Sequence, residues 1–206
     1  MPTEKELFIK AEAGQLEAAL LDVNPQKIGI ICHPHPQFGG SMENNVVYAL
    51  RDGMQRSGYS ALRFNFRGVG RSDRFYAEGA GEGRDLLIVL QYCKEKGYSE
   101  IVLSGYSFGA WIIASSLHQI SENYPLILVS PPTGIYDFSG LEIPEDYKCL
   151  IIAGTDDYIC PLRSLKSWCS SLSCELSLVT VQGTDHFYFG KEKKISDAVE
   201  TFLSGL

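Results

Sequence analysis

Short apolar runs recur along the chain and leave room for a helix between each pair. The run over residues 27–32 shows no alternation of apolar and polar positions, as expected of a strand covered on both faces. Further strands are predicted at residues 61–66, 101–103, 126–129, 149–153 and 176–181. The pattern is typical of a sheet whose successive strands are separated in sequence by longer connecting segments.

Amphipathic segments lie between these runs. Leu86, Leu87, Leu90 and Cys93 recur at helical spacing and predict a helix that ends near Gly97. Other helices are predicted around Val46, Val47, Leu50 and Met54 after a cap at Ser41, at 110–114, around Leu162, Leu165, Trp168 and Cys169, and around Ile195, Ala198, Val199, Phe202 and Leu203.

Strands that alternate with helices predict right-handed crossovers and a mainly parallel sheet with helices on both faces. Before this region, residues 6–11 and 16–21 flank Gly14 and Gln15, which predicts an antiparallel hairpin. The chain shows no internal repeat or linker, so we expect residues 1–206 to form a single α/β domain.

Net charge and cysteine positions limit which binding partners and which cellular compartment are expected. The 206 residues carry a net charge of −7 without any basic cluster, which disfavours nucleic acid and anionic membranes as partners. No secretory pattern is visible at the N-terminus, and no apolar run approaches the length of a membrane span. Cys160, Cys169 and Cys174 fit neither a CxxC pair nor a zinc spacing. We expect a reduced, cytoplasmic protein.

The strongest chemical signal is Gly-Tyr-Ser-Phe-Gly at residues 105–109, between an apolar run and a helical segment. The pattern G-x-S-x-G in this context is typical of a nucleophile elbow. A turn that lifts Ser107 clear of the backbone leaves space only for small residues two positions away. Ser107 would also lie at a helix N-terminus, where N–H groups face developing negative charge. We therefore predict Ser107 as a nucleophile.

A serine nucleophile needs a base, and the chain has four histidines: His33, His35, His118 and His186. His118 lies at the far end of the central helix. His186 follows the last predicted strand, so it should reach the sheet edge at which Ser107 lies. We predict His186 as the base.

The acid that orients the base should follow the strand at 149–153, where either Asp156 or Asp157 is suitable. Asp185 is a weaker candidate because neighbours in sequence rarely direct their side chains at one another's rings. The order Ser, Asp, His is that of α/β-hydrolases.

An oxyanion needs two N–H donors. Phe108 follows the nucleophile directly and should supply one. The other should come from the loop His33-Pro34-His35-Pro36 after the strand at 27–32, where the prolines have no N–H. His35 is the natural donor, with Gln37 as the alternative.

Two other interpretations, a metal site and a phosphate-binding loop, have less support from the sequence than a serine nucleophile. The segment 32–35, Cys-His-Pro-His, could be read as part of a metal site, but no third ligand with sensible spacing is evident, so no metal is expected. The segment 68–70, Gly-Val-Gly, lacks the rest of a phosphate-binding fingerprint and is typical of a tight turn.

The elbow, the loop at 154–161 and the segment 185–187, Asp-His-Phe, together resemble the α/β-hydrolase superfamily. The HPHP loop and residues 63–72 are similar to a branch of small serine hydrolases near the dienelactone-hydrolase-like and acyl-peptidase-like proteins. The acid position in that family's pattern implies Asp157 rather than Asp156. Because the dienelactone enzymes use a cysteine at the position of Ser107, their substrate is not implied.

The resemblance also raises the question of a lid, which superfamily members often insert after the strand that follows the elbow helix. Residues 130–148 are too short and too interrupted by proline and glycine for a helical cap domain, so the site should be open. Aromatic side chains that we expect as apolar walls are Phe38, Tyr136, Tyr158 and Phe187.

The resulting hypothesis is a serine hydrolase that cleaves an ester or related acyl bond through Ser107, His186 and Asp157. A small acyl compound is the expected substrate, no cofactor is implied, and the oligomeric state is left open. A peptidase or deacylase acting on acyl-peptides is the nearest alternative. A non-catalytic scaffold that binds a ligand or a protein in its cleft is the alternative from another class.

Overall fold

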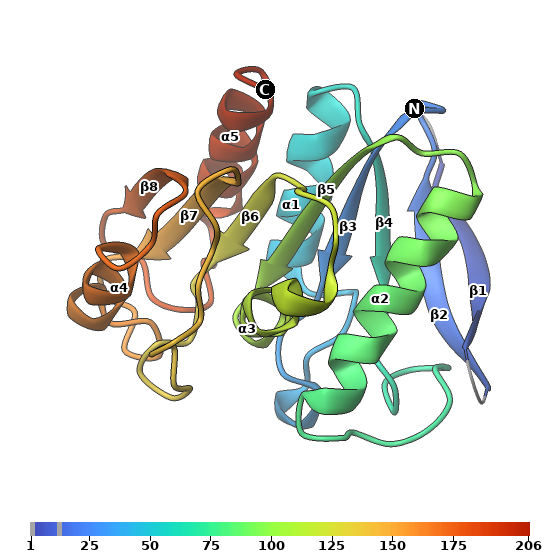
Figure 1. Ribbon diagram of the computed structural model, residues 1–206, viewed down its shortest axis with the longest axis horizontal. Coiled ribbons are helices and arrows are strands. Elements are labelled where there is room, and N and C mark those ends of the chain that lie inside the picture. The colour runs from blue at the N-terminus through green and yellow to red at the C-terminus, as the bar shows by residue number, and fades with distance from the viewer. Residues whose placement is uncertain (1–2, 12–13) are drawn as a thin grey trace.

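The computed structural model describes residues 3–11 and 14–206. Within these residues, eight strands form one sheet in the order β1-β2-β4-β3-β5-β6-β7-β8 (Figure 1). The strands are β1 (Lys5–Ala11), β2 (Gly14–Leu21), β3 (Lys27–Cys32), β4 (Ser60–Phe64), β5 (Glu100–Tyr106), β6 (Leu126–Val129), β7 (Lys148–Gly154) and β8 (Glu175–Val181).

Pairing in the sheet changes from antiparallel to parallel after the first strands. β1 pairs with β2 and β2 with β4 in antiparallel register, whereas every pair from β4 and β3 to β7 and β8 is parallel. The predicted hairpin is confirmed. Gly14 and Gln15, expected in its turn, are instead the first residues of β2, and residues 12 and 13 lie outside the described residues.

Helices cover both faces, as predicted (Figure 1). Those of the described residues are α1 (Asn45–Arg56), α2 (Ala80–Glu95), α3 (Phe108–Ser116), α4 (Leu162–Cys169) and α5 (Glu192–Leu203), with short 3₁₀ turns η1 (Pro36–Phe38) and η2 (Leu117–Gln119). One core lies under α1 and α5, and the other under α2, α3 and α4. The apolar stripe of α1 is buried as expected.

Several element boundaries differ from prediction. Asn44, not Ser41, caps α1, because its side chain accepts the N–H of Val46. The strand predicted over 61–66 ends at Phe64, since the N–H of Phe66 bonds the buried ring of His33 instead of a neighbouring strand. The central strand, predicted over residues 101–103, extends from Glu100 to Tyr106.

The parallel strands all end at one edge of the sheet, toward which the arrowheads of β3, β4 and β5 point downward in Figure 1. The described residues 130–147, between β6 and β7, contain no helix, so no helical cap covers this edge. Among the helices that the structure describes, none is long and apolar enough to cross a membrane.

Candidate active site

Ser107 lies at the junction of β5 and α3, in a backbone conformation that is strained for a residue with a side chain. Its φ is 53° and its ψ is −115°. The glycines on either side allow this turn. A Cβ on Gly105 would lie 2.5 Å from the carbonyl carbon of Gly109, and one on Gly109 would lie 2.3 Å from the carbonyl oxygen of Cys32. The strand–elbow–helix prediction is therefore realised in the backbone.

A continuous hydrogen-bond chain starts at this serine. The Nε2 atom of His186 lies 2.9 Å from Oγ of Ser107, and its Nδ1 lies 2.8 Å from Oδ2 of Asp157. All three residues are at most 7% exposed. β5, β7 and β8 each end directly before the loop or turn that supplies one of them, so parallel strands far apart in sequence bring them together.

Asp157 is held as a carboxylate. Its other oxygen, Oδ1, accepts the N–H groups of Ile159 and Cys160 at 2.9 and 2.8 Å. Burial alone would raise the pKa of Asp157, but the hydrogen bond and charge of His186, together with the Cys160 N–H, hold it below its ordinary value.

The two other acids considered from the sequence point elsewhere. Asp156 is exposed and accepts a hydrogen bond from the hydroxyl of Thr155, while Asp185 accepts the N–H of Phe187. Of the three aspartates, Asp157 is the one at the ring of His186. His118, exposed in η2, takes no part in this arrangement.

The two predicted oxyanion donors face the same pocket as Ser107. Both Phe108 and His35 line it, and within the described chain neither of their backbone N–H groups donates to a protein acceptor. Gln37, the alternative donor, uses its N–H on Nδ1 of His35. Two unused N–H groups beside a serine are what an oxyanion hole requires.

His33 does not share the role of His35. Its ring is fully buried, with Nδ1 2.6 Å from the carbonyl oxygen of Pro34 and Nε2 accepting the N–H of Phe66 at 3.0 Å. Burial lowers the pKa of His33 to about 4, so the ring is neutral. Since both nitrogens already have partners within the chain, the ring is not available to the metal site considered above.

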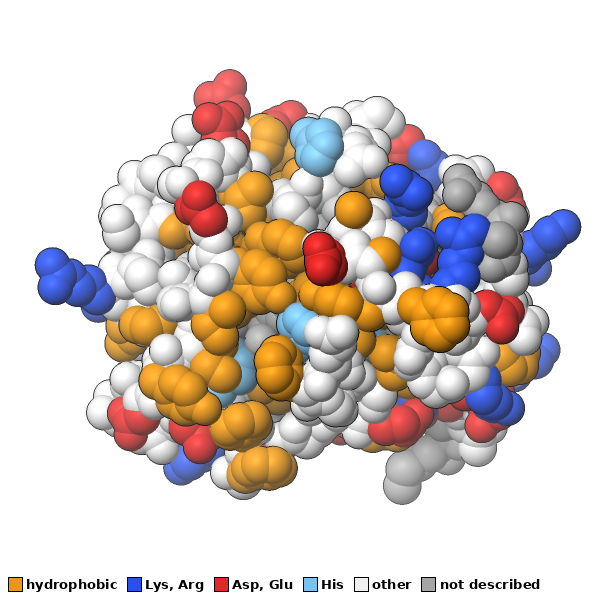
Figure 2. All heavy atoms as spheres, turned by 90° about the horizontal axis from the view of Figure 1, so that it is seen from below, with side chains coloured by type: hydrophobic (Ala, Val, Ile, Leu, Met, Phe, Trp, Pro, Cys, Tyr) orange, Lys and Arg blue, Asp and Glu red, His pale blue; other side chains and the backbone are white. Residues whose placement is uncertain are grey.

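The pocket over Ser107 has a volume of about 430 Å³ and is mainly apolar. All four predicted wall residues, Phe38, Tyr136, Tyr158 and Phe187, line it. Figure 2 shows this edge of the molecule, where hydrophobic side chains gather around histidines. Phe38 and Tyr158 are 86% and 71% exposed, so these walls of the pocket are accessible to solvent.

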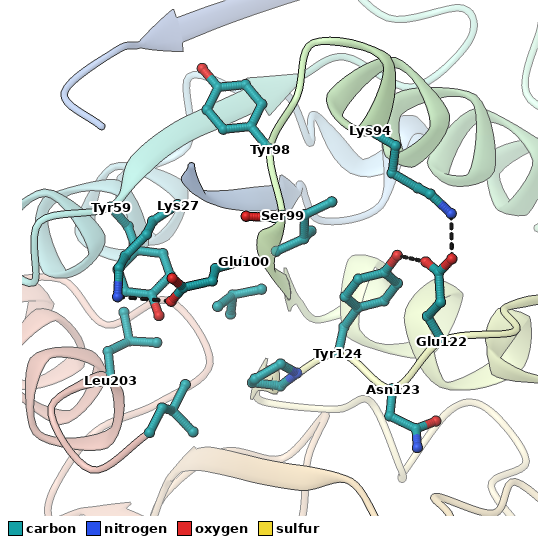
Figure 3. A pocket seen from close by; sticks show the side chains of 14 residues that line it. Lys27, Tyr59, Lys94, Tyr98, Ser99, Glu100, Glu122, Asn123, Tyr124 and Leu203 are labelled. Atoms are coloured by element: carbon teal, nitrogen blue, oxygen red, sulfur yellow. Dashed lines mark hydrogen bonds and ion pairs between the residues drawn. The ribbon is translucent and has the colours of Figure 1, made fainter. Parts of the chain in front are cut away.

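A larger hollow, of about 670 Å³, lies at the opposite, amino ends of the strands (Figure 3). Its lysines form ion pairs there: Lys27 with Glu100 at 2.8 Å, and Lys94 with Glu122 at 2.6 Å. Within each pair the two charges neutralise one another. Ser107 and His186 lie at the other edge of the sheet. The smaller pocket is therefore the one lined by the serine and histidine considered above.

Several supporting residues were missed from the sequence. The hydroxyl of Tyr106 donates to the backbone oxygen of His186 at 2.7 Å and so fixes the histidine loop. Ser130 hydrogen-bonds Tyr188 at 2.8 Å and also contributes to the lowered pKa of Asp157. Ser130 follows the end of β6 at the site edge, which is a signal that sequence reasoning could have used. Tyr106 and Tyr188 gave none.

Similarity to known proteins agrees with this geometry. An uncharacterized protein of Rickettsia prowazekii is 33% identical over 187 residues, which cover 85% of this chain and 78% of the other. An α/β serine hydrolase homologue from Coxiella burnetii superposes with a TM-score of 0.87 at 33% identity, over 96% of each chain.

An α/β serine hydrolase without a lid from Xanthomonas campestris has a TM-score of 0.89 at 30% identity and covers all of this chain and 96% of its own. The chain belongs to the lidless α/β serine hydrolases. No family model matches the sequence. For a lidless α/β-hydrolase, the uncovered sheet edge described above is the expected architecture.

Proposed function

We propose that this protein is a serine hydrolase that cleaves uncharged, apolar esters with Ser107 as nucleophile, His186 as base and Asp157 as orienting acid. The observation that carries the proposal is the hydrogen-bond chain from Ser107 through His186 to Asp157, at the base of a pocket with two unused N–H groups.

In the proposed reaction, Oγ of Ser107 attacks the ester carbonyl while Nε2 of His186 takes its proton. Asp157 accepts from Nδ1, which keeps the unprotonated Nε2 toward the serine and stabilises the imidazolium that forms. The N–H groups of Phe108 and His35 stabilise the oxyanion. His186 then protonates the leaving alkoxide, and a water molecule, deprotonated by the same ring, releases the acid and restores Ser107.

The lining of the pocket supports an apolar substrate. None of its sixteen residues is Asp, Glu, Lys or Arg, and apolar surface predominates. A charged group in the pocket would lose hydration without gaining an opposite charge. Aromatic walls at Phe38, Tyr136, Tyr158 and Phe187 instead match an alkyl or aryl group on either side of the ester.

The direct test is labelling with a fluorophosphonate probe, followed by kcat/KM for short p-nitrophenyl esters. We expect labelling of the wild-type protein and none of Ser107→Ala. The loss of kcat/KM in that variant should be roughly 10³-fold or more.

Asp157→Asn and Asp156→Asn form a matched pair for the acid. The first should lower kcat by roughly 10²- to 10⁴-fold, because it leaves His186 in the wrong tautomer. The second should retain full activity. Failure of a folded wild-type protein to react with the probe would favour the non-catalytic scaffold. Higher kcat/KM on acyl-peptides than on esters would favour the peptidase or deacylase.

A further inference from the structure

The ring of His35 is held at both of its nitrogens. Nδ1 accepts the N–H of Gln37 at 3.1 Å, so this nitrogen bears no proton. Burial lowers the pKa of His35, and a neutral ring then has its proton on Nε2. This N–H lies 3.1 Å from the hydroxyl of Tyr76, to which it donates. The tautomer is therefore determined by two partners.

Tyr76 is itself held from the opposite side of the pocket. It lies half-buried in the segment between β4 and α2, and its hydroxyl interacts with that of Tyr136, from the segment after β6. Burial, together with this interaction, raises the pKa of Tyr136. The ring of Tyr136 stacks on Trp111 of α3, with 4.4 Å between ring centroids and 28° between planes. The chain His35–Tyr76–Tyr136 thus ties the oxyanion loop to the elbow helix.

The backbone of His35 is restrained at its carbonyl end as well. Its carbonyl oxygen accepts the N–H groups of Phe38 and Gly40 at 3.1 and 3.0 Å. Pro34 and Pro36 on either side each have a fixed φ. The planar peptide that bears the His35 N–H is also held at the Pro34 carbonyl oxygen, which lies 2.6 Å from Nδ1 of His33. The anchored ring of His35 adds a restraint from the side-chain end.

We propose that Tyr76 is a positioning residue for the oxyanion hole: its hydroxyl fixes the ring of His35 and so keeps the backbone N–H of His35 directed into the pocket. The inference rests on the proposed function, because it assigns Tyr76 a part in transition-state stabilisation by that site. Tyr76 is not among the residues that line the pocket, so it acts through His35 rather than on the substrate.

Tyr76→Phe is the decisive variant, because it keeps the ring packed against His35 and Phe108, at centroid distances of 5.0 and 6.0 Å, and removes only the hydroxyl. We expect kcat to fall about 10-fold, less than the loss of a whole oxyanion donor, with KM for the ester almost unchanged. Affinity for a boronic acid transition-state analogue should fall by the same factor. Tyr92→Phe, at a half-buried position of α2 that does not line the pocket, is the matched control and should change neither value.

A double-mutant cycle with His35→Ala separates positioning from general packing, since alanine keeps the backbone N–H but has no ring. Tyr76→Phe should have no further effect on kcat in the His35→Ala background. Additive losses, a rise in KM at unchanged kcat, or full activity of Tyr76→Phe would each overturn the inference. All rates are referred to the fraction of protein labelled by the fluorophosphonate probe, so partial unfolding cannot imitate the effect.

The proposed function has its own test, separate from that of Tyr76. It is rejected if the wild-type protein is not labelled or if Ser107→Ala keeps its activity. A wild-type protein that depends on Ser107 together with an unaffected Tyr76→Phe would reject only the role of Tyr76.

Discussion

His33 and His35 stand two residues apart in the same loop, yet their environments are different. His33 is enclosed between its own loop and the segment after β4, where it replaces a strand partner for Phe66. His35 is half-buried at the pocket, with its ring between Gln37 and Tyr76. The ring of His33 thus joins two loops, whereas the ring of His35 lies at the pocket that contains Ser107. Spacing along the chain does not contain this distinction.

The burial of His33 predicts a pH dependence of stability. Its folded pKa of about 4 lies below its ordinary 6.5, so the unfolded chain binds the proton first as the pH falls. The free energy of unfolding should therefore decrease between pH 6.5 and pH 4, by up to about 3 kcal/mol from this group. Below pH 4 this contribution should be constant.

Urea unfolding of wild type and His33→Gln across pH 7 to 4 measures this effect, because carboxylates common to both proteins cancel in the difference. The stability advantage of wild type should shrink as the pH falls. A difference that stays constant over the whole range would show that His33 is not held neutral.

At the scale of elements, the elbow depends on two close backbone approaches. Gly105 allows β5 to pass next to Gly109, and Gly109 allows α3 to begin against the carbonyl of Cys32 at the end of β3. The second contact matters for chemistry, because His33 and His35 follow Cys32 directly. The elbow and the oxyanion loop are therefore placed by the same packing.

Gly109→Ala should consequently affect stability and activity together. The added Cβ would lie 2.3 Å from a backbone oxygen, so β3 or α3 must shift. We expect a loss of about 3 kcal/mol in the free energy of unfolding and slower fluorophosphonate labelling. Gly205→Ala is the control, since its nearest neighbour is 3.5 Å away, and it should change stability by less than about 0.5 kcal/mol. Equal stability of the two variants in urea would contradict this account of the elbow.

For the molecule as a whole, the charged side chains lie apart from the apolar lining of the pocket over Ser107. The chain has a net charge of −7, whereas the pocket at the carboxyl edge of the sheet has no acidic or basic residue in its lining apart from two histidines. The face in Figure 2 presents apolar side chains around that pocket. Long-range repulsion and local desolvation therefore both disfavour an anionic substrate.

This separation predicts a preference between two esters of matched length. The value of kcat/KM for p-nitrophenyl hexanoate should exceed that for the mono-p-nitrophenyl ester of adipic acid by at least about 10-fold. Most of the difference should persist at about 0.5 M salt. At that concentration screening suppresses repulsion between separated charges, but it does not remove the cost of desolvating the carboxylate. Equal rates, or a gap that salt abolishes, would show that the pocket lining does not select the substrate.

The sequence by itself determined the alternation of strands and helices, the elbow at Ser107 and the absence of a helical cap. These are local properties: apolar spacing, small residues around a tight turn, and the length of one connection. It also singled out His186, because parallel strands must end at one edge of the sheet. Boundaries such as the cap at Asn44 were not determined, since several nearby side chains can cap a helix equally well.

Only the tertiary structure decided which groups meet. That Asp157 rather than Asp156 lies at His186 depends on the direction of adjacent side chains in one loop, which the sequence pattern leaves open without a family resemblance. The links from Tyr76 to His35 and from Tyr106 to the His186 loop join segments 41 and 80 residues apart. Hydrogen bonds of this kind leave no periodic trace in the sequence, because each depends on a single side chain meeting a distant part of the chain.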